Sequence, residues 1–303
     1  MNPSASLIFN PVAGKGSAEA ELEQIKKNLS PAFDLDIQLT TKEVDADVLA
    51  RECLERGATT ILVSGGDGTL STAASALIKT DVRLGVIPRG TANAFALAVG
   101  IPTDIEGSCR TILAEATQRI DVARCNGKLT VLLTGIGFEA DTVKNTTRTA
   151  KNRLGSMAYL VSAIGQLWHF NSFEVKIETE EEAIATEAAA ISVANAAPPT
   201  SVLAQGPAGI IYDDGMLDIT IAAPRTRRGA ILASYHLFQT ALKGHPVARE
   251  DLRYLRARSV KITTKPEQNV VVDGDMAGKT PVEIECVAGG LNVFLPPKKE
   301  EEQ

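Results

Sequence analysis

The sequence is poor in the side chains that most often bind zinc or form disulfide bridges. Its 303 residues include three histidines and four cysteines. The histidines lack metal-ligand spacing and the cysteines form no Cys-x-x-Cys pair, which argues against zinc chemistry and against a disulfide framework. The first residues show no signal-peptide pattern, so we expect reduced thiols in a cytoplasmic protein.

Excess positive charge and a long hydrophobic run are missing as well. The formal net charge of −6 argues against a broad electrostatic contact with nucleic acid. A local basic cluster of Arg225, Arg227 and Arg228 suits either anionic lipid headgroups or the exposed start of a helix. The apolar stretch 154–170 is about as short as a membrane span can be and is interrupted by polar residues. Its helical periodicity favours a core-facing amphipathic helix over a membrane-surface helix, and no transmembrane segment is predicted.

What the sequence does contain is enough apolar material for two packed domains. Hydrophobic residues make up 44% of the chain, and its length exceeds that of one usual domain. In the first part, strand patterns at 7–10, 33–39, 60–63 and 84–87 alternate with helical patterns, including 22–29 and 48–56. This succession predicts an α/β domain with a parallel sheet over residues 1–122, which residues 290–303 could complete.

After about residue 120, strand patterns dominate. They cover 129–134, 173–178, 184–193, 217–221, 260–263, 270–272, 282–286 and 291–295. Two helical stretches, near 154–170 and 228–242, interrupt them. The pattern predicts a mostly antiparallel β domain over residues 123–289.

Three glycine-containing turns follow strands of the first domain. They are Asn10–Gly16, Gly65–Thr69 and Pro88–Asn93. Glycine lets backbone amides approach an anion closely, and a helix N-terminus adds partial positive charge. Each turn alone is also compatible with an ordinary bend, but three at one edge of a parallel sheet predict a phosphate-binding site.

Asp67 indicates that this phosphate-binding site also holds a cation. A carboxylate inside a phosphate-binding turn would repel the phosphate unless a cation lay between them. Mg²⁺ bridging Asp67 to a nucleotide removes that conflict. The alternative is that Asp67 is the N-cap of a helix beginning at Thr69.

In their order and spacing, the three turns resemble the catalytic domain shared by diacylglycerol kinases, sphingosine kinases and soluble bacterial lipid kinases. The run Gly65–Thr69 also occurs in NAD kinases and, in reduced form, in phosphofructokinases, whereas Asn10–Gly14 and Pro88–Asn93 point to the lipid kinases. The resemblance implies a Rossmann-like first domain of the NAD kinase and phosphofructokinase type and a mostly antiparallel β-sandwich second domain. It implies that ATP contacts Asn10, Pro11, Val12, Ala13, Gly14, Thr40, Gly65, Gly66, Asp67, Gly68, Thr69, Leu70, Ser71 and Thr91.

The resemblance extends to two segments of the second domain. In the run Ile211–Asp218 it implies that the Asp214 carboxylate and the carbonyls of Ile211 and Met216 hold a structural Mg²⁺; a hairpin turn is the alternative. The run Val272–Asp275 resembles an Asp-Gly-Glu motif. By that match Asp275 is the general base toward the lipid hydroxyl, with Asp273 as the second candidate and a plain turn as the alternative.

Some positions depart from the family pattern. Val44 replaces a glycine, Ser71-Thr72 replaces Asn-Glu, and Ala94 and Leu97 stand where Asp and Arg are usual. The favoured hypothesis is ATP- and Mg-dependent phosphorylation of a lipid hydroxyl, on diacylglycerol or a related lipid, during transient contact with a membrane surface. An NAD kinase-like enzyme and a non-catalytic nucleotide-binding module are the alternatives. The sequence leaves open the lipid, the choice of ATP or GTP, and whether the chain is a monomer or a homodimer.

Overall fold

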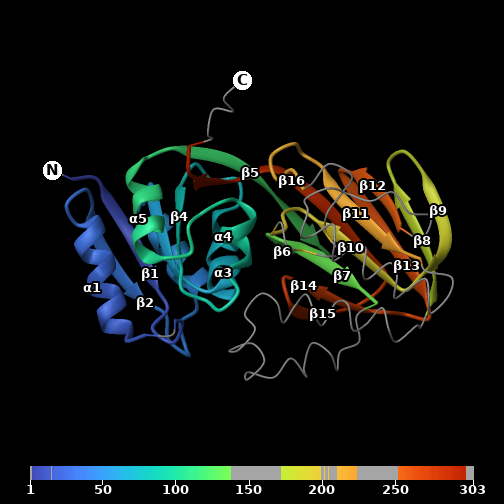
Figure 1. The fold of residues 1–303 in the computed structure, drawn as a ribbon, viewed down its shortest axis with the longest axis horizontal. Helices are drawn as coiled ribbons and strands as arrows, with labels where there is room; N and C mark the ends of the chain where they lie inside the picture. Colours follow the sequence, from blue (N-terminus) through green and yellow to red (C-terminus); the bar gives the residue numbers. More distant parts are fainter. Residues whose placement is uncertain are drawn as a thin grey trace. The chain divides into compact units, whose positions relative to one another are not determined.

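The computed structural model describes residues 2–14, 16–137, 172–198, 201, 204, 210–223 and 252–297. The chain divides into two compact units, Met1–Ile120 with Gly289–Gln303, and Asp121–Ala288 (Figure 1). The helices expected near 154–170 and 228–242, and the cluster Arg225, Arg227 and Arg228, lie outside the described residues. In the part of the chain that is described, no helix is long and apolar enough to cross a membrane.

The first unit is an alternation of strands and helices. Its elements are β1 (Ser4–Phe9), α1 (Ala18–Leu29), β2 (Asp34–Leu39), α2 (Ala46–Glu55), β3 (Thr60–Gly65), α3 (Asp67–Leu77), β4 (Arg83–Pro88), α4 (Ala94–Ala98) and α5 (Ile105–Leu113). The strands lie in the order β2-β1-β3-β4 and pair in parallel. The end of β16 (Val282–Phe294) adds a further parallel pairing, of Asn292 and Val293 with β4.

The burial of the strands shows that the sheet is covered on both faces. β1, β3 and β4 are almost continuously buried, as expected for strands covered on both faces, whereas the edge strand β2 alternates. α1 packs beside α5 (Figure 1). α2 packs beside α3. Since the strands are parallel, the turns that follow β1, β2, β3 and β4 all lie at the same edge of the sheet.

The second unit contains two antiparallel sheets. The strands after α5 are β5 (Thr117–Cys125), β6 (Lys128–Thr130), β7 (Leu133–Ile136), β8 (Phe173–Thr179), β9 (Ala183–Ala188), β10 (Ala190–Ala194), β11 (Leu217–Ala222), β12 (Leu252–Ala257), β13 (Ser259–Lys265), β14 (Asn269–Val272) and β15 (Asp275–Lys279). One sheet has the order β12-β11-β10-β7-β14-β15, and the other runs from β16 through β13 and β8 to β9. Apolar side chains from both sheets, including Ile136, Ile177, Ile219 and Ile262, form one buried cluster between them. The predicted fold class, a parallel α/β domain followed by an antiparallel β-sandwich, is confirmed.

Several strand boundaries differ from the sequence-based expectation. The strand expected over 129–134 is two strands, β6 and β7, because the Asp273 carboxylate binds the backbone amides between them. The strand expected over 184–193 is also two, which belong to different sheets and separate at Ala189. Conversely, the strands expected at 282–286 and 291–295 are one, β16.

Candidate active site

The residues predicted to contact a nucleotide gather at the carboxyl edge of the parallel sheet. Asn10–Gly14 follow β1, Thr40 follows β2, Gly65–Ser71 join β3 to α3, and Thr91 follows β4. Thr40 is buried and its backbone N–H donates to the Phe9 carbonyl at 3.0 Å, which ties the end of β2 to β1. The fold therefore brings the three turns together at one edge, which is what a phosphate-binding site requires.

Asn10 links the first turn to the second. Its Nδ2 donates to Thr69 Oγ1 at 2.8 Å, and its backbone N–H donates to the Ser64 carbonyl at 2.9 Å. Its Oδ1 accepts from the Val12 backbone N–H at 3.1 Å, which closes a turn within its own loop. Asn10 thus fixes the loop by side-chain and backbone bonds, while the Val12 side chain next to it is 91% exposed.

The backbones of the second and third turns lie against each other at Gly66 and Gly90. A Cβ added to Gly90 would lie 2.7 Å from the Gly66 Cα, and one on Gly66 would lie 3.3 Å from the Gly90 Cα. The Arg89 backbone N–H also donates to the Gly65 carbonyl at 2.7 Å. The two backbones are therefore in close contact: Gly90 has no room for a side chain, and Gly66 has only a tight fit for one.

Asp67 also joins the second turn to the third. It is the first residue of α3, whose N-cap is Gly66, so it does not cap a helix beginning at Thr69. Its Oδ1 accepts from the Phe95 backbone N–H at 3.0 Å, in the first turn of α4, where Asn93 offers no side-chain cap. Asn93 instead turns its Oδ1 toward the Gly90 N–H, at 2.7 Å. The Asp67 carboxylate is half-buried, so one part of it is anchored and the rest can face a ligand.

The N-terminus of α3 has the electrostatic character that an anion site needs. The N-cap residue of this 11-residue helix is Gly66, which has no side chain to bind the first amides. Those amides and the helix dipole attract a negative charge to the start of the helix. A phosphate there would lie close to the Asp67 carboxylate, which is the situation that calls for a bridging cation.

Arg89 is a residue of this edge to which the sequence analysis gave no role. Its guanidinium is 1% exposed and pairs with Glu21 of α1. It donates to the backbone carbonyls of Asn10, at 2.9 Å, and Ala13, at 2.7 Å. The signal in the sequence was a cation at the end of a strand that is otherwise apolar, followed directly by a turn glycine.

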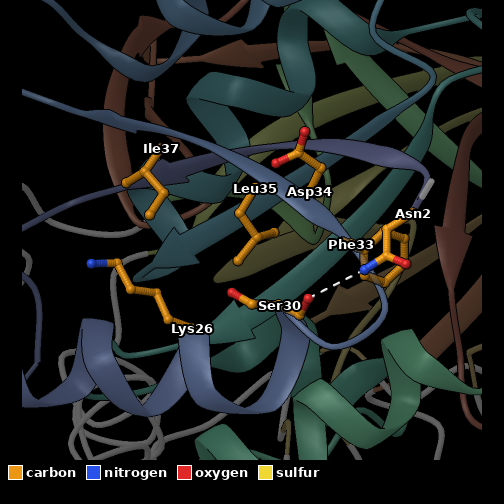
Figure 2. A pocket seen from close by; sticks show the side chains of 7 residues that line it. All are labelled: Asn2, Lys26, Ser30, Phe33, Asp34, Leu35 and Ile37. Carbon is orange, nitrogen blue, oxygen red and sulfur yellow. Dashed lines mark hydrogen bonds between the residues drawn. The ribbon is translucent and has the colours of Figure 1, made fainter.

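A hollow elsewhere in the first unit does not coincide with these turns. It has a volume of about 550 Å³ and lies between α1 and β2, lined in part by Asn2, Ser30 and Asp34 (Figure 2). Asn2 precedes β1 and Asp34 begins β2, so the hollow opens toward the amino ends of the strands. Ligands of parallel sheets bind at the carboxyl ends, and the hollow therefore plays no part in the candidate site.

In the second unit, Asp273 is a central residue of a tight hairpin turn and Asp275 is the first residue after that turn. Asp273 and Gly274 both have positive φ, 49° and 93°, as a type I′ turn between β14 and β15 requires. The Asp273 carboxylate accepts backbone N–H bonds from Val131 at 2.8 Å, Leu132 at 3.0 Å and Leu133 at 3.1 Å. Asp275, the first residue of β15, is exposed. The two carboxylates thus differ: one anchors backbone and the other faces solvent.

The segment predicted to bind a structural metal is an acidic turn before β11. Ile211 is 40% exposed and Gly215 has a φ of 76°. Asp214 forms an ion pair with Arg256 of β12, and its Oδ1 accepts from the Met216 N–H at 3.1 Å. Asp121 Oδ2 accepts from the Gly215 N–H at 2.6 Å.

Asp218 adds a buried negative charge beside this turn. Its side chain is 1% exposed, and burial raises the pKa of its carboxyl to about 6, although Arg256 counteracts part of this effect. The Arg256 Nε lies 3.1 Å from Asp218 Oδ1, but neither carboxylate oxygen has a hydrogen-bond partner among the described residues. Within the same residues, no group of three or more His, Cys, Asp or Glu side chains is arranged around a single metal position.

Comparison with known proteins gives two matches that together span almost the whole chain. Residues 4–125 match the family described as "Diacylglycerol kinase catalytic domain". Residues 132–295, more than half of the chain, match the family described as "YegS C-terminal NAD kinase beta sandwich-like domain".

Individual proteins are also similar to this chain over nearly all of its length. The Synechocystis protein sll0036, whose name states no activity, is 45% identical over 301 residues, covering 96% of this chain and 70% of the relative. A protein named diacylglycerol kinase from Bacillus subtilis is 28% identical, with 98% of each chain covered. A crystal structure of a diacylglycerol kinase from Bacillus anthracis superposes with a TM-score of 0.80 at 29% identity, covering 97% of both chains.

Proposed function

The chain belongs to the family of soluble bacterial lipid kinases that join a diacylglycerol kinase catalytic domain to a YegS-type C-terminal domain, and we propose that it transfers the γ-phosphoryl group of ATP to a lipid hydroxyl. Diacylglycerol is the first acceptor to consider, because several relatives are named for it. Such an acceptor resides in a membrane, so we propose that the enzyme contacts the membrane surface transiently.

The observation that carries the proposal is that a carboxylate, Asp67, is the first residue of α3, whose first amides have no side-chain cap. An amide-lined helix start attracts phosphate, whereas a carboxylate at the same place repels it. The combination is useful to a protein that binds a phosphate together with a divalent cation. Phosphoryl transfer needs little else from the protein than positioning and charge compensation.

Each turn would then have a defined task. The backbone of Asn10–Gly14 and the first turn of α3 would hold the phosphate oxygens, and Thr40, Ser71 and Thr91 would line the edge around the nucleotide. Asp67 would orient a hydrated Mg²⁺, and this ion supplies charge neutralisation for the β- and γ-phosphate oxygens when it is bound. Because the contacts are largely to backbone, they discriminate poorly between ATP and GTP.

We propose Asp275 as the general base. Its carboxylate would accept the proton of the lipid hydroxyl while the oxygen forms its bond to the γ-phosphorus and the bond to the β-phosphate oxygen breaks, releasing ADP. Its exposure leaves it available for a substrate. Asp273 is the weaker candidate because its carboxylate already accepts three backbone N–H bonds.

The acidic turn before β11 fits a structural cation by its charge and donor chemistry. Asp121 and Asp214 each accept a backbone N–H of this turn, Asp218 follows it, and Arg256 is the counter-charge in the described contacts. Among the described residues, none donates a hydrogen bond to the buried Asp218 oxygens, and Mg²⁺ prefers oxygen ligands. The Asp214 carboxylate and the carbonyls of Ile211 and Met216 would hold the ion, which would offset the remaining negative charge.

The experiment is transfer of labelled phosphate from ATP, with Mg²⁺, to a panel of lipids in mixed micelles, with NAD as a soluble acceptor in parallel. Asp67→Asn is the informative variant. It keeps an oxygen for the Phe95 N–H while it removes the charge that would orient the cation. Asp104→Asn is the matched control, because Asp104 caps α5 through the Gly107 N–H at 2.7 Å and lies outside the candidate site.

A labelled lipid that disappears with Asp67→Asn and persists with Asp104→Asn would establish the proposed activity and its acceptor class. We expect turnover to fall at least a hundredfold in Asp67→Asn. Labelled NADP in place of a lipid product would support an NAD kinase-like enzyme instead. ATP binding without transfer to any acceptor would support a nucleotide-binding regulatory module.

A further inference from the structure

We propose that Arg89 is a positioning residue that holds the loop Asn10–Gly14 in its phosphate-binding conformation, with Glu21 as its counter-ion. For its effect on ATP the proposal rests on the function proposed above. Its effect on the loop does not depend on that function. The glycine pattern of the turn Pro88–Asn93 predicts neither the burial of Arg89 nor its contacts with the loop and Glu21.

The Arg89 guanidinium binds that loop through two of its backbone carbonyls. Nη1 donates to the Asn10 carbonyl at 2.9 Å and Nη2 donates to the Ala13 carbonyl at 2.7 Å, so one planar group binds both ends of the turn. Nε donates to Glu21 Oε2 at 2.7 Å. The guanidinium carbon also lies 4.0 Å from the centroid of the Phe9 ring, at the end of β1.

Burial makes this arrangement specific to arginine. The side chain is 1% exposed, and a buried cation is tolerated only when its charge is paired and its donors are satisfied. Glu21 supplies the charge, and the two carbonyls use the forked donors. A lysine ammonium has no fixed planar fork and could not hold both carbonyls and Glu21 in the same geometry.

The direction of the carbonyls links Arg89 to ligand binding. In a trans peptide the carbonyl and the following N–H point in opposite directions. Since the Ala13 carbonyl points to Arg89, the Gly14 N–H points away from it, to the outer side of the loop. Gly14 has a φ of 102°, and a Cβ there would lie 2.6 Å from Glu21 Oε2 and 3.1 Å from Arg89 Nη2.

Arg89 acts on the phosphate through the loop rather than by contact. Its guanidinium is shielded from solvent, and its donors are engaged by the Glu21 carboxylate and by the two loop carbonyls. Loss of Arg89 should therefore loosen the loop and weaken nucleotide binding, with little effect on the transfer step once ATP is bound.

The test compares Arg89→Met with Arg83→Met. Arg83 is a matched control because it begins β4, the strand that Arg89 follows, and donates to Thr60 Oγ1 at 2.8 Å. Its guanidinium carbon lies 5.4 Å from the centroid of the Phe294 ring. Arg83 lies at the amino end of β4, whereas the loop lies at the carboxyl edge. Hydrogen exchange of the peptide covering residues 10–16, ATP affinity measured with a fluorescent ATP analogue, and KM and kcat are followed for both variants.

We expect Arg89→Met to speed exchange in the loop at least tenfold and to raise the KM and the dissociation constant for ATP at least tenfold, with kcat within threefold of wild type. Arg83→Met should lower thermal stability and leave both loop exchange and ATP affinity within twofold of wild type. Arg89→Lys, which keeps the charge, should give intermediate values, and it carries the same test if Arg89→Met does not fold.

Unchanged loop exchange and ATP affinity in Arg89→Met would overturn the proposal. So would a loss of thermal stability in that variant without faster loop exchange, since this would make Arg89 a merely structural residue. If wild type binds no ATP while loop exchange still responds to Arg89→Met, the function proposed above fails and the role of Arg89 in holding the loop stands.

Discussion

Replacement of Asp273 offers a direct test of how the two aspartates of the β14–β15 hairpin divide their tasks. The Asp273 carboxylate accepts the amides of Val131, Leu132 and Leu133, and two of these share Oδ1. A hydrogen bond to a charged group contributes about 1.5–3 kcal/mol, but bonds that share an acceptor are not additive. We therefore expect removal of the carboxylate to destabilise the second unit by about 3 kcal/mol.

Three substitutions separate the carboxylate from the turn. Asp273 has a φ of 49°, so alanine should add about 1 kcal/mol of backbone strain that glycine avoids. Asparagine tolerates this conformation and keeps one oxygen for Leu132 and Leu133 but sets an NH₂ group against the Val131 N–H. The expected order of stability is wild type, Asp273→Asn, Asp273→Gly and Asp273→Ala.

Thermal unfolding followed by circular dichroism measures this order. For a unit of this size 1 kcal/mol corresponds to about 2–4 °C, so Asp273→Gly should lower the midpoint by about 6–12 °C. Hydrogen exchange of the peptide covering residues 128–136 should rise with it. The reasoning is refuted if Asp273→Gly unfolds within 2 °C of wild type while turnover falls more than a hundredfold, since Asp273 would then be the base.

The other predictions concern separate parts of the molecule. Asp275→Asn should lower kcat by about 10²–10⁴-fold with stability unchanged, and Asp275→Glu should retain at least a tenth of wild-type kcat; equal losses in both would contradict a general base. Gly90→Ala should abolish binding of the fluorescent ATP analogue, because its Cβ would lie 2.7 Å from the Gly66 Cα; wild-type affinity would show that the turns can separate. Burial raises the pKa of Cys109 to about 12, so mass spectrometry should find this thiol unmodified by iodoacetamide at pH 8 in the folded protein and modified in urea; modification of the folded protein would contradict its burial. Chelation of divalent cations should lower the thermal midpoint of wild type, and Asp214→Asn should remove that response; an equal response in both would place the cation elsewhere.

Local sequence patterns were sufficient for the strands and turns of the first unit. β3 and β4 are apolar runs that end directly in glycine turns, so their boundaries are visible in the residues themselves. In a parallel sheet the turns that follow the strands must share an edge. The position of Asp67 at that edge could therefore be anticipated, although its bond to the Phe95 N–H, 28 residues away, could not.

The second unit was less predictable because contacts between distant residues decide its strand boundaries. Nothing near residue 131 indicates that a carboxylate from residue 273 interrupts the strand there. Conversely, the pair Gly289-Gly290 reads as a break, yet β16 continues through it and Gly289 adopts a φ of 56°. Strand β12 (Leu252–Ala257) was missed because three of its residues are only partly buried and Arg253 and Arg256 interrupt its apolar residues.

Arg89 illustrates the same limit at the candidate site. A buried arginine cannot be told from an exposed one by its neighbours in sequence, since its partners come from β1, its following loop and α1. The sequence could indicate that a cation stands in the third turn. Only the folded chain shows that it faces inward, toward two carbonyls and a carboxylate.

The pairing of β16 with β4 has a consequence for how the protein is made. Asn292 and Val293 complete the parallel sheet, and Phe294 is fully buried in the core of the first unit. These residues leave the ribosome only after the whole second unit has been synthesised. The first unit must therefore wait with an unpaired strand edge while the sandwich is translated, a period in which that edge is open to other chains or to chaperones. Synthesis order and folding order are thus inverted: the domain that begins the chain is the last to be finished.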